Sequence, residues 1–128
     1  MDEPSPSEPD SHGIRAALAP VVVRVLRRHG REPVKLAEPA GASAPWFSLK
    51  DDAGAPLVLV AAHDHHVHFL LGRRGFVASR HWVEAEIDAL ARWFEDVLDA
   101  ALGGGLEVHA GGTTATLRTR SGAIPLSA

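Results

Sequence analysis

Two stretches of the chain carry apolar residues at helical spacing. In the first, the intervals of three and four residues place the apolar side chains on one helix face; they are Ile14, Leu18, Val21, Val22, Val25 and Leu26. Pro20 lies inside this stretch, where it either kinks the helix or marks its first turn. A strand through Val21–Val23 is the alternative, because β-branched residues favour strands.

The second helical pattern runs from Trp82 to Leu102 and is the longer one. Its apolar positions alternate spacings of four and three; they are Val83, Ile87, Leu90, Phe94, Val97 and Ala101. Three glycines follow directly, Gly103–Gly105, and glycine is the residue that most often ends a helix. The pattern therefore predicts an amphipathic helix over 82–102.

Between and after the helices, short apolar runs bounded by glycine, proline and aspartate predict strands. These runs are Trp46–Lys50, Leu57–His63, His66–Leu71, Phe76–Ala78, Leu106–Ala110 and Thr113–Arg120. Gly111 and Gly112 separate the last two runs and suit a hairpin turn with positive φ at both positions. Pairing across that turn places Val108 opposite Ala115 and Leu106 opposite Leu117.

The element order predicts an α+β fold with one mainly antiparallel sheet of about five strands packed against two helices. Residues 1–12 hold acids and prolines but no large apolar side chain beyond Met1, so we expect a disordered acidic tail. A single domain is predicted for residues 13–122, with a loose end over residues 123–128.

Composition narrows the function classes. The 128 residues suit one domain, and 45% hydrophobic with 23% charged residues is typical of a globular chain. The chain has no cysteine, which excludes disulfides, thiolate metal sites and thiol nucleophiles. No stretch reaches the roughly 18–20 apolar residues of a membrane span, so no membrane association and a cytoplasmic location are expected. A net charge of −3 argues against binding to nucleic acid.

The segment from Ala62 to Phe69 concentrates histidines. If its hairpin turns at Asp64-His65, Ala62 pairs with Val67 and Val60 with Phe69, and His63, His66 and His68 project from the opposite face. Three imidazoles can ligate zinc, which makes a metal-dependent enzyme or a metal sensor the alternative function. A three-residue turn would move His68 to the other face, and a polar hairpin tip is the simpler interpretation. Apart from this segment, nucleophile elbows, phosphate loops and dinucleotide fingerprints are missing from the sequence.

The polar side of the second predicted helix is acidic, with Glu84, Glu86, Asp88, Glu95, Asp96 and Asp99 against Arg92 alone. Acids near a helix C-terminus are disfavoured by the dipole, and a basic partner would offset that cost. Trp82 and Trp93 either widen the core stripe or, if half-exposed, anchor a partner. The candidate partner-binding residues are therefore Trp82, Glu86, Trp93, Asp96 and Asp99.

In element order, residues 14–120 resemble secretion-chaperone-like domains, which bind a client chain through a curved sheet and usually dimerise. The helix that ends those domains has no counterpart here, and no motif is shared. The resemblance implies protein binding and a homodimer.

The sequence thus favours a non-catalytic protein-binding domain without a cofactor, chaperone-like or of the toxin-neutralising immunity type. Its acidic helix and a sheet edge would contact a protein with a basic surface. A domain with a small-molecule pocket between sheet and helices is a third hypothesis.

Overall fold

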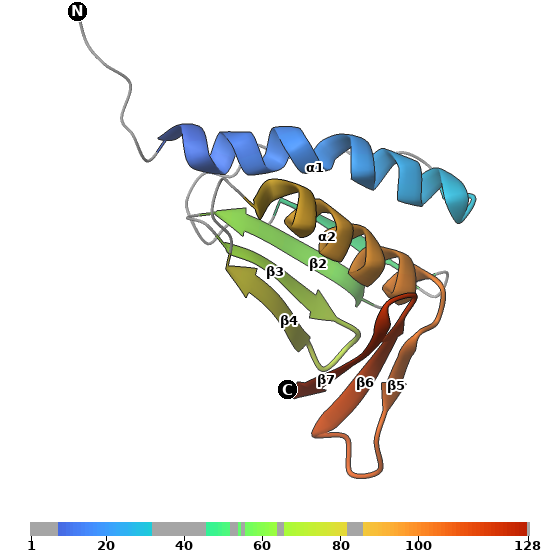
Figure 1. The fold of residues 1–128 in the computed structure, drawn as a ribbon. Coiled ribbons are helices and arrows are strands. Elements are labelled where there is room, and N and C mark those ends of the chain that lie inside the picture. Colours follow the sequence, from blue (N-terminus) through green and yellow to red (C-terminus); the bar gives the residue numbers. More distant parts are fainter. Residues whose placement is uncertain are drawn as a thin grey trace, which may run out of the picture.

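The computed structural model describes residues 8–31, 46–51, 54, 56–63, 66–81 and 86–127, without the side chains of residues 8–14 and 63. These ranges form two helices and two antiparallel sheets, which confirms the α+β class (Figure 1). The elements are α1 (Glu8–Arg28), β1 (Phe47–Lys50), β2 (Pro56–His63), β3 (His66–Leu71), β4 (Phe76–His81), α2 (Ile87–Leu102), β5 (Leu106–Val108), β6 (Thr114–Thr119) and β7 (Gly122–Ser127).

The larger sheet has the strand order β1-β2-β3-β4, with every neighbour antiparallel. Strand residues alternate between its two faces, and one face is apolar and buried. That inner face includes Phe47, Val58, Val60, Val67, Phe69, Leu71 and Phe76. Together with residues of both helices, these side chains form the hydrophobic core.

The two helices lie side by side over this sheet and run in the same direction (Figure 1). The described part of the predicted α1 stripe is buried, and Leu18, Val22 and Val25 are fully inaccessible to solvent. Pro20 is exposed and the helix continues through it, so the strand alternative does not apply. A proline costs one backbone hydrogen bond, which the packing of both flanking turns can offset.

The end of α2 is the one predicted from the three glycines. The amide of Gly103 donates to the carbonyl of Asp99, and Gly104 adopts a φ of +80°. The amide of Gly105 then donates to the carbonyl of Ala100 at 2.7 Å. A left-handed residue directly after a helix satisfies its last carbonyls in this way. At the other end, the described helix begins at Ile87, and residues 82–85 lie outside the described part.

The second sheet has the order β5-β6-β7 and lies beyond the C-terminal end of α2 (Figure 1). Val108 pairs with Ala115 and Leu106 with Leu117, as predicted. Gly111 and Gly112 both have positive φ, also as predicted. Ala115 and Leu117 are buried, and β6 packs against α2.

Two details of the prediction are corrected. The strands form two sheets instead of one, because sequence order does not reveal that β6 pairs with β7 and that no hydrogen-bonded ladder joins them to β4. The last residues, predicted as a loose end, form β7, in which Leu126 is buried and pairs with Ala115. β7 contains Pro125, which is tolerated because β7 is an edge strand.

The first helix also begins earlier than predicted. Residues 8–12, assigned to the acidic tail, belong to α1, while residues 1–7 lie outside the described part. Acidic residues and a proline suit a first helical turn, which explains the earlier start. Neither described helix is long and apolar enough to cross a membrane.

Candidate functional site

The histidine-bearing hairpin has the predicted register. Ala62 pairs with Val67 and Val60 with Phe69, so His66 and His68 share the outer face of the larger sheet. Their rings are stacked, with centroids 5.5 Å apart and planes at 13°. A third imidazole, His81 of β4, meets His66 edge to face at 4.9 Å.

The predicted metal site consists of His63, His66 and His68. His63 pairs with His66 across the hairpin, but its side chain is not among those described. Among the described residues, no group of three or more histidine, aspartate or glutamate side chains is arranged to hold a metal ion. The zinc site therefore stays a prediction.

His81 was missed because the predicted strand ended at Ala78 and a helix was expected soon after. The signal was available in the alternation of Val77, Ser79 and His81, which places them on one face of a strand continuing to residue 81. Histidine is thus a feature of the outer sheet face and not only of the hairpin tip.

The acidic residues of α2 do not form a single face. Glu95 and Asp99 point to α1, where Arg24 and Arg28 each approach a Glu95 carboxylate oxygen to 2.8 Å. Asp99 receives Arg28 at 3.2 Å and the His29 ring nitrogen Nε2 at 2.8 Å. The basic groups that compensate these two acids therefore belong to the same chain.

These contacts shift the titration of both acids. Hydrogen bonds from Arg24 and then Arg28 hold the pKa of Glu95 below its usual value. Partial burial by itself would raise the pKa of Asp99, but the hydrogen bonds from His29 and Arg28 outweigh burial and lower it. Both carboxylates are thus stabilised in the charged form by α1.

The spacing of charged residues in the sequence could have indicated the ion pairs between α1 and α2. Arg24 and Arg28 are four residues apart on one helix, and Glu95 and Asp99 are four residues apart on the other. Residues at this spacing lie one above the other, so two parallel helices can match them pairwise. The predicted partner-binding residue Asp99 is therefore engaged within the chain, where Arg120 also lies 3.7 Å away.

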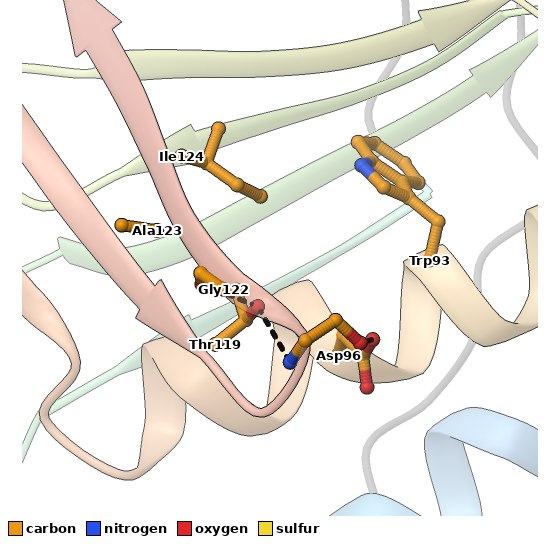
Figure 2. Close-up of a pocket in the computed structure, with 7 residues that line it drawn as sticks. Trp93, Asp96, Thr119, Gly122, Ala123 and Ile124 are labelled. Atoms are coloured by element: carbon orange, nitrogen blue, oxygen red, sulfur yellow. Dashed lines mark hydrogen bonds between the residues drawn. The ribbon is translucent and has the colours of Figure 1, made fainter.

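Asp96 faces a different way and lines a groove between α2 and the turn that joins β6 to β7 (Figure 2). The hydroxyl of Ser121 donates a hydrogen bond to Asp96 Oδ2. The groove has a volume of about 270 Å³ and is lined by Trp93, Asp96, Thr119, Ser121, Gly122, Ala123 and Ile124. Ser121 lies in the turn before β7, and Gly122, Ala123 and Ile124 are the first residues of β7. The sequence predicts a loose end from residue 123 onward, so it does not identify this wall of the groove.

Trp93 combines both roles considered for it from the sequence. Its indole packs edge to face on Phe69 of β3, with centroids 5.6 Å apart, and so extends the core. The same side chain is half-buried and lines the groove across from Ile124 (Figure 2). The contact with Phe69 fixes the orientation of the ring that a ligand in the groove would meet.

One further predicted partner-binding residue, Glu86, lies at the N-terminal end of α2. Glu86 occupies the N-cap position, is exposed and makes no capping hydrogen bond through its side chain. Trp82 lies outside the described residues. Glu86 is separated along the helix from the groove at Trp93 and Asp96, so two of the four predicted residues that the structure describes lie together at the groove.

Comparison with family models, curated proteins and solved structures finds no match to this chain. The resemblance in element order to secretion chaperones therefore stays a prediction. Function must be argued from the groove, the histidines and the charges.

Proposed function

We propose that this chain is a non-catalytic protein-binding domain, chaperone-like or toxin-neutralising, that contacts a partner with a basic surface. The contact is made by the acidic helix α2 near Trp93 and Asp96 and by the neighbouring sheet edge. Asp99 supports that surface through its intrachain ion pairs and does not itself meet the partner.

The observation that carries this proposal is the placement of Trp93 and Asp96 at one open groove. A tryptophan held rigidly at the surface of a recess is typical of the residues that dominate binding energy at protein interfaces. Asp96 adds a negative charge that selects a basic partner and speeds association with it.

The sheet edge adds a second kind of contact. Among the described strands, β7 pairs with β6 alone, so its other edge keeps backbone groups that no described strand satisfies. An extended segment of a partner can add to such an edge by main-chain hydrogen bonds. Because the groove begins where β7 begins, one bound segment can use the edge and the groove together.

The test is affinity capture with the full chain as bait, followed by quantitative mass spectrometry. Asp96→Lys reverses the charge at the groove, and Asp88→Lys makes the same change elsewhere on α2; circular dichroism checks that both fold. We expect a captured protein whose yield falls at least fivefold with Asp96→Lys and in about 0.5 M NaCl, but not with Asp88→Lys. If no captured protein distinguishes the two variants, the proposal is wrong.

A metal-binding function at His63, His66 and His68 is the second candidate, and the cross-strand pairing of His63 with His66, next to His68 on the same face, favours it. It is tested by metal analysis of protein purified without a polyhistidine tag. Stoichiometric zinc that is lost in His66→Ala would support the metal site, and less than a tenth of an equivalent of any transition metal would exclude it under those conditions.

A further inference from the structure

We propose that the groove between α2 and the β6–β7 turn holds one basic side chain, a lysine or arginine of the bound partner. This inference rests on the proposed protein-binding function and names the chemical group recognised at that site. It follows from the charge, the shape and the size of the groove.

The charge argument begins with the three acids in the second half of α2. Glu95 and Asp99 are each paired with basic side chains of α1. For Asp96, among the described residues, the hydrogen-bonding partner is the neutral hydroxyl of Ser121, and no basic side chain lies within ion-pair distance. Arg120, next to Ser121 in the chain, approaches Asp99 instead.

Asp96 therefore keeps a negative charge that the described residues do not neutralise. Its Oδ2 accepts from Ser121, and Oδ1 retains the capacity to accept from a ligand. A cation is the ligand that such a place favours.

The walls of the groove explain why the cation should be carried by an aliphatic stem. Trp93 and Ile124 face each other across it, with Ala123 beside Ile124 and Asp96 toward the turn (Figure 2). Lysine and arginine bury their methylene stems along apolar surface while keeping the charged group at a polar site. The groove matches such a side chain, because its apolar walls can contact the methylene stem and the Asp96 carboxylate can bind the charged group.

The volume of the groove helps to decide whether its ligand is one side chain of a partner or a free small molecule. The volume of about 270 Å³ is below the range of about 300–1,000 Å³ that is usual for cofactor and drug-sized ligands. The groove is also partly open, and β7, whose first residues line it, pairs with β6 alone among the described strands, so a longer bound chain can extend beyond the groove. One side chain presented by a longer chain therefore fits better than a small molecule does.

The inference is tested with small probes that do not require the partner. The probes are the N-acetyl, N′-methylamide derivatives of lysine, arginine and norleucine; norleucine keeps an aliphatic stem but lacks the charge. Binding is followed by the indole N–H signal of Trp93 in ¹⁵N-correlated NMR spectra, assigned with Trp93→Phe. We expect saturable shifts for lysine or arginine with a dissociation constant on the order of millimolar, and at least tenfold weaker binding of norleucine.

Asp96→Asn preserves the shape of the side chain and removes its charge, and Asp88→Asn is the matched control. We expect Asp96→Asn to weaken binding of the basic probes at least fivefold and Asp88→Asn to leave it unchanged. Equal binding of norleucine and lysine, or no shift with about 50 mM of either basic probe, would overturn the inference. If capture of a partner still depends on Asp96 in that case, the proposed function stands without it.

Discussion

The imidazole of His29 in α1 lies 2.8 Å from the carboxylate of Asp99 in α2, measured from Nε2 to Oδ1. With Arg24, Arg28 and Glu95, this contact joins the two helices along their exposed seam. These five side chains form a polar seam between α1 and α2, and the apolar residues of both helices belong to the core. Ion pairing and core packing therefore favour the same side-by-side placement of the two helices.

A double-mutant cycle of Arg28→Met and Glu95→Gln measures the contribution of this seam. We expect a small favourable coupling free energy, because both side chains are partly exposed and such pairs contribute little. Urea unfolding supplies the free energies. Arg27 is exposed on the same helix and has no contact with Glu95, so a cycle with Arg27→Met should give no coupling. Equal coupling in both cycles would contradict the seam.

The seam also predicts an acid dependence of stability. The pKa of Glu95 and that of Asp99 are lowered in the folded chain, so their contribution is complete above the usual carboxyl pKa, about 4, and is lost as pH falls through the folded values. Asp99→Asn removes part of that dependence. We expect the free energy of unfolding of the wild type to fall toward that of Asp99→Asn between about pH 5 and pH 3. A constant difference over this range would contradict the assignment.

Gly105 is predicted to be more sensitive than its neighbour Gly104. A Cβ at Gly105 would lie 2.5 Å from the backbone oxygen of Arg118, because the chain leaves α2 tightly against β6. A Cβ at Gly104 meets nothing within 4 Å, and only its φ of +80° opposes alanine. We expect Gly104→Ala to cost about 1 kcal/mol of stability and Gly105→Ala more than about 2 kcal/mol. Thermal and urea unfolding of both variants make the comparison, and equal costs would contradict the close approach.

Substitution of Leu126 tests whether β7 is an ordered strand that contributes to the stability of the fold. Its side chain is 6% exposed and pairs with Ala115, whereas Ser127 beside it is exposed. Leu126→Ala should lower the free energy of unfolding by about 2 kcal/mol or more, and Ser127→Ala should change it by less than about 0.5 kcal/mol. A loose end, as the sequence suggested, would make both substitutions equally harmless.

Much of the local structure followed from sequence patterns. The stripe from Leu18 to Leu26 and the stop at Gly103 were readable because helix periodicity and chain termination depend on near neighbours. The hairpin pairing of Ala62 with Val67 was equally local, since a short turn sets the register of the strands it joins. These features were predicted and are confirmed.

The candidate site was predictable only in part. Trp93 was identified as a tryptophan that could either widen the core stripe or anchor a partner, and Asp96 as one of the acids toward the C-terminal end of the predicted helix, where a basic partner would offset the dipole. Their partners were not, because Ser121 and Ile124 lie more than twenty residues away in a segment whose order depends on pairing with β6. Burial of Leu126 stabilises that segment, and burial is a property of the assembled fold.

The sequence by itself determined the central parts of both helices and the hairpins β2–β3 and β5–β6, because periodicity, turn chemistry and composition act over a few residues. Only the tertiary structure decided which way each acid of α2 faces. Glu95 and Asp99 meet α1 and Asp96 meets the β6–β7 turn because the core, packed from several elements at once, sets how α2 is rotated between them. That rotation turns Asp96 toward the β6–β7 turn and away from the basic side chains of α1.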